Sequence, residues 1–457
     1  MSRWGVWVLS ASFVLLLATS VLMHAQTPAT PPAIHQELDR RAGAVNDQVI
    51  AWRRDFHQHP ELGNHEVRTA GIVAAELRRL GLEVRTGVAR TGVVAVLRGT
   101  RLGPVIALRA DMDALPVTEE TDVPFKSVVT TQYEGKTVGV MHACAHDTHT
   151  AMLLGAATVL SGMKDSLPGA VVFLFQPAEE GSPSGEEGGA ALMLKEGVLD
   201  DPKVEAIFGL HAFSGHGLGT AGGLMVRPGG IMAASDRLAI IVRGRQTHGG
   251  QPWAGVDPVV VAAQVIMGLQ TIVSRQMDLT VAPVVATIGT VEAGNRYNIV
   301  PEEVRMTGTL RTFDAEMRRD LHRRVDQMAT RIAESAGATA EVRIADGIPV
   351  TWNDPALTAA TIPSLQRVAS AGFDANVSPI TPAEDFSLYQ ARVPGVFFFL
   401  GVDPPGADRA SLAPNHSPRF FVDERALATG VRALASVAID YLYRRQQDNP
   451  SAAAARP

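Results

Sequence analysis

Acidic, imidazole and thiol side chains gather after apolar, strand-like runs of this sequence. The runs are Val105–Leu108, Val171–Phe175 and Ala206–Leu210. A further set of such polar side chains lies in the loop before a helix-like segment, Ala151–Leu160. Burying such groups costs free energy unless a cation or partner compensates, so a metal site explains them better than a structural polar cluster. The positions are Asp111, Asp113, His142, Cys144, His146, Asp147, His149, Glu179, Glu180 and His211.

The chemical types of these side chains limit which metal ions can bind. A thiolate with imidazoles and carboxylates suits zinc, or manganese and cobalt where oxygen ligands dominate. The set offers more ligands than one tetrahedral ion needs, which predicts two divalent ions that share a bridge. Such a pair lowers the pKa of a shared water and polarises a carbonyl oxygen, so the pattern predicts hydrolysis.

Cys144 is the only cysteine of the chain, so an intramolecular disulfide is excluded. The thiol could be a metal ligand, or the nucleophile of a cysteine hydrolase with His142 or His146 as base. The Cys-x-His spacing favours coordination, because catalytic Cys and His residues are usually far apart in sequence. A non-catalytic metal-binding protein is a further alternative, although such a site needs no second glutamate beside a ligand.

The elements that must position these residues form an α/β pattern. Runs that are apolar throughout, such as Val93–Leu97 and Gly395–Leu400, are typical of strands buried on both faces of a mostly parallel sheet. In open α/β sheets ligands bind at the carboxyl ends of strands, where most of the candidates lie. We therefore predict one catalytic α/β domain made from residues 35–231 and 346–445.

A different unit interrupts this domain at residues 232–345. Its strand-like and helix-like segments follow the order β-α-β-β-α-β, which is that of a ferredoxin-like α+β domain. Asp257 and Pro258 suit the N-cap and first turn of its first helix. That helix is apolar over Val259–Leu269 to a degree that one packed face does not explain, which predicts a second contact surface.

Charge and composition exclude some partners and suggest export. The 457-residue chain has a formal net charge of −6 and no basic tract, which argues against nucleic acid as a partner.

Residues 1–25 hold Arg3, an apolar run from Gly5 to Val21 and a small residue before a Pro-rich linker, as in a cleaved signal peptide. An uncleaved membrane anchor is the alternative. The expected location is periplasmic or secreted, and residues 446–457 are expected to form a flexible tail.

Eight segments, in order, carry a likeness to a known family. They are Arg53–Thr69, Ala107–Val117, Met141–Ala157, Phe175–Gly181, Gly209–Phe213, Gly289–Arg311, Ala383–Ser387 and Asn415–Phe420. As a set they resemble metallopeptidase family 20, in particular its amidohydrolase branch of hippurate, N-acyl amino acid and auxin-conjugate hydrolases. The resemblance covers nearly the whole chain after the signal. It implies a zinc-peptidase-like catalytic domain and an inserted dimerisation or lid domain.

The resemblance also implies roles for single residues. Glu179 would be the general base, and Asp113 would orient a ligand. Asn298 and Arg311 would bind the substrate carbonyl and carboxylate, and His248 would stabilise the oxyanion in the partner's active site. The ligands of two divalent ions (zinc, manganese or cobalt) would be Cys144, His146, Glu180, His211 and His416.

Three departures from the family pattern lie near these residues. Ala145 replaces the usual glycine between Cys144 and His146. Trp253 replaces the second histidine of the family's HGAxPH stretch, and Ser182–Glu187 lengthens the loop after the glutamate pair. We expect the longer loop to shape substrate access.

The expected function is metal-dependent hydrolysis of the amide bond in small N-acyl amino acids, hippurate-like or with aromatic acyl groups. A dipeptidase or aminoacylase on the same scaffold is the alternative, because pocket shape decides the acyl preference. The expected protein partner is a second copy of the chain in a homodimer or higher homo-oligomer, with no nucleic acid and no stable membrane association after signal cleavage.

Overall fold

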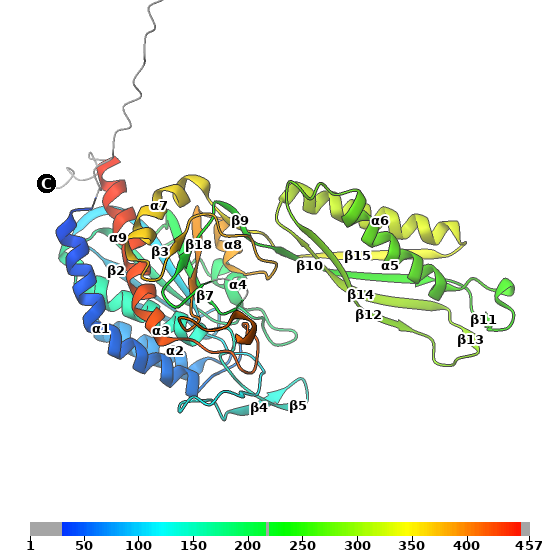
Figure 1. The fold of residues 1–457 in the computed structure, drawn as a ribbon, viewed down its shortest axis with the longest axis horizontal. Helices are drawn as coiled ribbons and strands as arrows, with labels where there is room; N and C mark the ends of the chain where they lie inside the picture. Colours follow the sequence, from blue (N-terminus) through cyan, green and yellow to red (C-terminus); the bar gives the residue numbers. More distant parts are fainter. Residues whose placement is uncertain (1–29, 216–218, 449–457) are drawn as a thin grey trace, which may run out of the picture.

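The computed structural model describes residues 30–215 and 219–448. The predicted signal at 1–25 and residues 449–457 of the predicted tail lie outside this range. A catalytic unit and an elongated insert are joined by a narrow neck (Figure 1). The helices are α1 (Pro32–Gln58), α2 (Val67–Arg79), α3 (His146–Ser161), α4 (Gly189–Lys195), α5 (Pro258–Arg275), α6 (Ala315–Ser335), α7 (Pro355–Val368), α8 (Phe386–Gln390) and α9 (Leu427–Asp448).

Among the described residues, the catalytic unit is centred on an eight-stranded sheet of order β1-β2-β6-β3-β7-β18-β8-β17. Its centre, β6-β3-β7-β18, is parallel, which confirms the predicted mostly parallel sheet. The strands β6, β7 and β18 are buried along their whole length, as their apolar sequences require. The strands are β1 (Glu83–Val88), β2 (Gly92–Arg98), β3 (Arg101–Asp111), β6 (Pro168–Gln176), β7 (Ala206–Phe213), β8 (Leu224–Met225), β17 (Phe373–Asp374) and β18 (Gly395–Gly401).

Helices cover both faces of this sheet. The helices α1, α3 and α9 pack together in one hydrophobic cluster, whereas α4 and α8 contribute to a second cluster on the other face. The helix α3 contacts both α1 and α9. It is apolar on nearly all sides and almost entirely buried. A hairpin, β4 (Thr130–Tyr133) with β5 (Lys136–Gly139), projects from the loop that precedes α3.

The insert has a four-stranded antiparallel sheet of order β12-β14-β10-β15, with α5 and α6 packed against it. In chain order this is 2-3-1-4, so the predicted ferredoxin-like α+β unit is confirmed. Asp257 accepts a hydrogen bond from the backbone N–H of Val259 and thereby caps α5 as predicted. The strands are β10 (Ala234–Arg243), β12 (Val284–Ala293), β14 (Glu303–Thr312) and β15 (Thr339–Ile348), with a short pair, β11 (Thr247–His248) and β13 (Ile299–Val300), at the far end.

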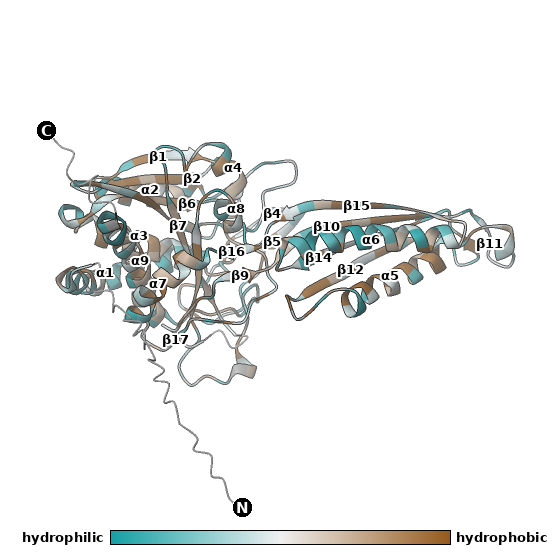
Figure 2. Cartoon of the chain, turned by 90° about the horizontal axis from the view of Figure 1, so that it is seen from above, coloured by the Kyte–Doolittle hydropathy of each residue, from teal (hydrophilic) through white to brown (hydrophobic). Residues whose placement is uncertain are grey.

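The two helices of the insert differ in polarity. Figure 2 shows α6 as mainly hydrophilic and α5 as mainly hydrophobic. Within the described residues, α5 is the helix long and apolar enough to cross a membrane by length and composition, and a third of it (33%) is buried. Its residues Val261, Val265 and Leu269 pack on the sheet, while Val260 and Met267 are exposed.

The neck of the molecule consists of two neighbouring chain segments. The chain enters the insert at the start of β10 and leaves it at the end of β15, and Ser235 pairs with Ile348 across these ends. On the catalytic side the same segments continue from β9 (Gly229–Met232) and into β16 (Thr351–Asn353), which also pair. The insert is therefore attached to the catalytic unit through two chain segments that lie side by side.

Candidate active site

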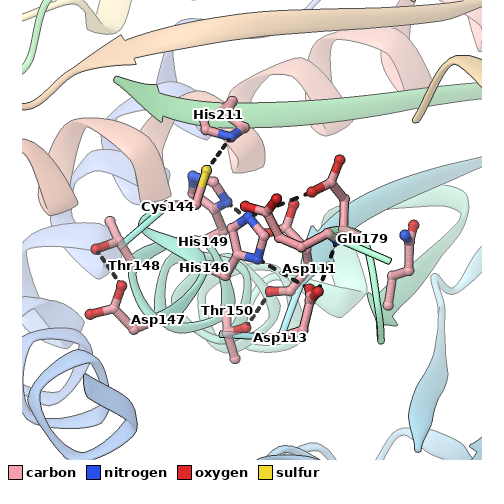
Figure 3. A network of polar contacts seen from close by, with 12 residues as sticks. Asp111, Asp113, Cys144, His146, Asp147, Thr148, His149, Thr150, Glu179 and His211 are labelled. Carbon is pink, nitrogen blue, oxygen red and sulfur yellow. Dashed lines mark hydrogen bonds and ion pairs between the residues drawn. The ribbon is translucent and has the colours of Figure 1, made fainter. Parts of the chain in front are cut away.

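The carboxyl ends of β6 and β7, the loop before α3 and the loop with His416 bring the predicted metal ligands together. Figure 3 labels Cys144, His146 and His211 of this set. Cys144 Sγ lies 3.5 Å from His211 Nε2 and 3.2 Å from His416 Nε2. His416 Nε2 lies 3.0 Å from Glu180 Oε1. Three overlapping groups have all their ligand atoms within 4.8 Å, namely Cys144–His146–His211, Cys144–Glu180–His416 and His146–Glu179–Glu180. Because the groups share members, the cluster has room for neighbouring ions.

Carboxylates hold the imidazoles of this cluster in place. Asp113 contacts His146 Nδ1 at 3.1 Å through one oxygen and accepts the backbone N–H of Glu180 at 2.9 Å through the other. His149 uses both ring nitrogens, with Asp111 Oδ1 at 2.6 Å and the backbone N–H of Ala212 at 2.8 Å. His149 is thus a structural hydrogen-bonding residue, whereas Asp113 fixes the direction of His146.

A buried arginine lies behind the cluster, and sequence reasoning missed it. Arg109 donates to Asp111 at 2.6 Å and to Asp385 at 2.8 Å, and it forms an ion pair with Glu384 at 2.9 Å. All of these side chains are buried. The guanidinium compensates a group of carboxylates that would otherwise be costly to bury. The available signal was the adjacent pair of acids, Glu384 and Asp385.

Burial shifts the proton affinities of the cluster. Burial raises the pKa of Glu179 well above its usual value, and the neighbouring Glu384 and Glu180 raise it further. Burial also raises the pKa of the Cys144 thiol. Hydrogen bonds to Cys144 and Glu180 raise the pKa of His416 to about 10. The site therefore combines buried anionic groups with a carboxyl group that holds a proton more strongly than usual.

The residues present fit a pair of divalent ions. The cluster combines a thiol, three imidazoles and carboxylates, which is a zinc-type donor set with added oxygen character. His146 Nε2 is buried and makes no hydrogen bond, and neither nitrogen of the neighbouring buried His142 makes one. Buried polar atoms without partners are rare in native proteins and often mark a place for an ion. A nearby cation would also favour the thiolate form of Cys144.

Two residues in the loops that carry the candidate metal ligands have left-handed backbone conformations. Ala145, at the N-cap of α3, has a φ of 68°, and His416 has a φ of 70°. Glycine adopts this region freely, whereas a residue with a Cβ is strained there by roughly 1 kcal/mol. The alanine that replaces the family's glycine therefore keeps a conformation suited to glycine, and the fully buried surroundings of Ala145 hold it there.

A cleft of about 1320 Å³ opens beside the cluster, and Asp113 and Glu180 are among its lining residues. The long loop forms one wall, since residues 181–186 line the cleft. Asn64 Nδ2 donates to Glu186 Oε2 at 2.9 Å and to the Glu187 carbonyl at 3.2 Å, which fixes this loop to the segment before α2. Residues of the hairpin β4–β5 line another side.

The sequence of the chain matches a known family. The family described as Peptidase family M20/M25/M40 matches residues 107–440. The chain belongs to this family. It is accordingly a hydrolase of the metal-dependent amidohydrolase type, which acts on amide bonds.

Relatives of this M20 hydrolase are similar over almost its whole described length. Thermostable carboxypeptidase 2 of Saccharolobus solfataricus is 38% identical, covering 89% of this chain and 98% of its own. IAA-amino acid hydrolase ILR1-like 4 of Arabidopsis thaliana is 38% identical, covering 87% and 86%. A solved Bacillus subtilis structure, described as a dinuclear metal-binding peptidase of the M20 family, is 35% identical with a TM-score of 0.73, covering 88% and 99%.

Three of the residues to which the resemblance assigned roles lie on the insert, outside the metal-ligand cluster. His248 is exposed on β11 at the far end, and the carbonyl of Asn298 accepts a hydrogen bond from the Gly249 N–H beside it at 2.8 Å. Arg311 lies near the opposite end of the insert, where β14 pairs with the start of β10. The M20 chain thus brings the ligands, Glu179 and Asp113 together, but separates Asn298 from Arg311 by most of β14.

Proposed function

We propose that this protein hydrolyses the amide bond of N-acyl amino acids, with Glu179 as the general base. The observation that carries this proposal is the position of Glu179 within the ligand cluster. Its Oε2 lies 3.9 Å from His146 Nε2, next in sequence to the candidate ligand Glu180. The five candidate ligands, Glu180 included, suffice to hold two ions, so the Glu179 carboxylate remains available for proton transfer.

The candidate ligands of the two ions are Cys144, His146, Glu180, His211 and His416. When bound, divalent ions polarise a carbonyl oxygen and make water a better nucleophile at neutral pH. The chain's own contribution is to hold the imidazoles in fixed orientations, through Asp113 for His146 and through the Ala212 carbonyl, 3.0 Å from Nδ1, for His211.

Glu179 transfers the proton in this scheme. As a carboxylate it accepts a proton from the attacking water, and the protonated carboxyl group then donates that proton to the leaving amine. Burial and neighbouring carboxylates raise the pKa of Glu179, which makes the carboxylate a stronger base than an exposed one.

The substrate class rests on the relatives and the cleft. One relative is described as a hydrolase of IAA-amino acid conjugates and another as a carboxypeptidase. Both descriptions involve an amide bond next to an amino acid. A cleft of about 1320 Å³ is large enough for an aromatic acyl group, so we propose N-acyl amino acids, including hippurate-like ones, ahead of dipeptides.

A panel of substrates tests this proposal. N-benzoylglycine, N-acetylmethionine, indole-3-acetyl-alanine and alanyl-alanine are incubated with protein reconstituted with zinc, manganese or cobalt, and the released amino acid is quantified. We expect at least one N-acyl amino acid to be cleaved with a higher kcat/KM than the dipeptide. A preference for the dipeptide would instead support the dipeptidase alternative, and hydrolysis of none would contradict the proposal.

We further propose that His248 acts in the active site of a second copy. In its own chain it lies at the far end of the insert from the catalytic unit (Figure 2, where β11 is labelled). Its Nδ1 accepts the backbone N–H of Gly250 at 3.0 Å, so its Nε2 carries the proton of the neutral ring. An exposed N–H donor on a projecting tip is suited to stabilise an oxyanion in a neighbouring subunit.

The insert also offers a surface for such a second copy. The strand β12 is an edge of the four-stranded sheet, and Val285 and Val291 on it are exposed. On α5, Val260 is 55% and Met267 68% exposed. Exposed apolar residues on one edge strand and the adjacent helix are typical of a subunit interface. We propose that two copies associate through this edge.

Mixing two inactive variants tests the composite site. His248→Ala and Glu179→Gln are each expected to be nearly inactive, and co-refolding them should restore roughly a quarter of wild-type activity, because half of the random dimers then contain one intact site. If His248 acted within its own chain, every site would retain a defect and no activity would return. A fully active monomer, found by sedimentation at assay concentration, would also contradict the proposal.

We propose export for this protein on the strength of the signal-like pattern at residues 1–25, which lies outside the described residues. Mass determination of the N-terminus of the protein recovered from its host would test whether that segment is cleaved.

A further inference from the structure

Glu66 carries a fully buried carboxylate that the reaction outlined above does not use. It is the N-cap residue of α2, yet its side chain makes no capping bond to that helix. Two N–H groups at the start of α2 are bonded instead by Glu61, which accepts from Arg68 at 2.9 Å and from Thr69 at 2.8 Å. The Glu66 carboxylate is therefore free to bond elsewhere.

Both oxygens of Glu66 contact segments that are distant in sequence. Oε1 accepts the backbone N–H of Ala178 at 2.8 Å, and Oε2 accepts the hydroxyl of Thr91 at 2.5 Å. Thr91 lies between β1 and β2, so its bond fixes the carboxylate to the sheet. A buried carboxylate is costly unless it is hydrogen-bonded, so these two bonds determine where it lies. Ala178 is the residue directly before Glu179.

The backbone on each side of Glu179 is thus bonded to a carboxylate. On one side the Ala178 N–H donates to Glu66, and on the other the Glu180 N–H donates to Asp113 Oδ2 at 2.9 Å. Asp113 also contacts the candidate ligand that precedes helix α3, so its side of the turn belongs to the metal-ligand cluster. The contact with Glu66 is the separate anchor on the other side.

The turn that carries Glu179 is strained and closely packed. Ala178 has a φ of 51°, a left-handed conformation that a residue with a Cβ adopts reluctantly. Gly63 lies so close to the turn that a Cβ at this position would be 2.7 Å from the Gly181 carbonyl oxygen. Loss of the bond to Glu66 would let Ala178 relax toward an ordinary conformation, and Glu179 would move with it.

We propose that Glu66 is a positioning residue for the general base, because its hold on Ala178 sets where the Glu179 carboxylate lies. This inference rests on the proposed function, in which Glu179 accepts the proton of the attacking water. The base must lie within hydrogen-bond reach of that water, so a displacement of about 1 Å lowers the rate steeply. Since Glu180 is held separately by Asp113, loss of Glu66 should slow the chemical step and leave the metal bound.

Two substitutions at Glu66 separate hydrogen bonding from side-chain shape. Glu66→Leu leaves the Ala178 N–H without an acceptor, so we expect kcat for the best panel substrate to fall about 10- to 100-fold, with KM within about twofold of wild type. Elemental analysis should find the wild-type amount of metal. Glu66→Gln keeps an oxygen for Ala178, and burial raises the pKa of Glu66 to about 8, so an uncharged side chain is well tolerated there. This variant should stay within about threefold of wild type.

A double-mutant cycle with Glu179→Gln tests whether Glu66 acts through the base. If it does, adding Glu66→Leu to Glu179→Gln should change the remaining kcat by less than about twofold, because no base is left to position. Long incubations with mass-spectrometric detection of the released acyl acid measure these low rates. A loss of equal size in both backgrounds, or loss of metal from Glu66→Leu, would overturn the inference and leave the proposed function intact. A wild-type kcat in Glu179→Gln would overturn both.

Glu196→Leu is the matched control. Glu196 accepts the backbone N–H of another left-handed alanine, Ala89, at 2.9 Å, but this alanine lies in the turn between β1 and β2. The control should keep kcat within about twofold of wild type.

Thr91→Val provides the same test if Glu66→Leu does not fold. It removes only the hydroxyl bond to Glu66, so we expect a smaller loss of kcat, about 3- to 10-fold, that again disappears in the Glu179→Gln background. A wild-type kcat in Thr91→Val, or the same loss in both backgrounds, would overturn the inference.

Discussion

Glu179→Gln is expected to lower kcat by about 10²- to 10⁴-fold while both ions remain bound. Glutamine keeps the shape of the side chain and removes its ability to accept a proton. Since Glu179 Oε2 is 3.9 Å from His146 Nε2, the substitution leaves the ligand contacts of the cluster in place. Steady-state kinetics with the best panel substrate and metal analysis of the same sample measure the two effects separately.

Glu180→Gln is the matched comparison for this prediction. Glu180 is next in sequence, but its Oε1 lies 3.0 Å from His416 Nε2 within the ligand cluster. The Glu180→Gln protein should therefore bind metal more weakly, and its activity should fall as a consequence. Should Glu179→Gln retain its turnover once metal is added back, Glu179 would not be the base, and Cys144 as a nucleophile would regain weight.

Complete removal of metal is expected to abolish hydrolysis, and zinc, manganese or cobalt should restore it. The reason is the composition of the cluster, in which Cys144, His146 and His211 place their ligand atoms within 4.8 Å of one another. In the proposed function these side chains act by holding ions, and the bound ions activate the amide and the water. Dialysis against a chelator, elemental analysis and add-back titration measure the dependence. Full activity in metal-free protein would refute it.

Alkylation of Cys144 provides a readout that does not depend on turnover. A thiolate bound to metal is shielded, so iodoacetamide should label the chain slowly before chelation and faster afterwards. The chain has no other cysteine, which makes the mass shift unambiguous. Capture of an acyl group on Cys144 during turnover would instead indicate the cysteine-hydrolase mechanism.

The sequence was sufficient to predict the elements that carry most ligands. Strands that are apolar throughout had to lie in a buried parallel sheet, and polar residues at their carboxyl ends had to meet at one edge. The loop with Cys144 and His146 and the strand end at His211 therefore converge as expected. The insert was equally predictable, because period-two strands, Asp257 and Pro258 define its elements locally.

Other parts of the site depend on contacts distant in sequence. His416 lies in an irregular loop with a left-handed backbone, so no periodicity marked it, and only the family likeness indicated it. Arg109 sits inside an apolar strand, and its partners Glu384 and Asp385 are more than 270 residues away in sequence. Arg237 of β10 lines the cleft, but no sequence pattern marks it, because its position there follows from how the insert meets the catalytic unit.

The paired segments of the neck make the width of the cleft an adjustable quantity. Because the chain enters and leaves the insert side by side, at Ser235 and Ile348, the attachment resembles a hinge with a single axis. A small rotation about this axis would carry Arg237 toward or away from Glu180, while the ligand cluster, which lies entirely in the catalytic unit, would stay unchanged. Substrate length would then be selected by an angle between two rigid bodies, and mutations at the neck could alter specificity without touching the metal ligands.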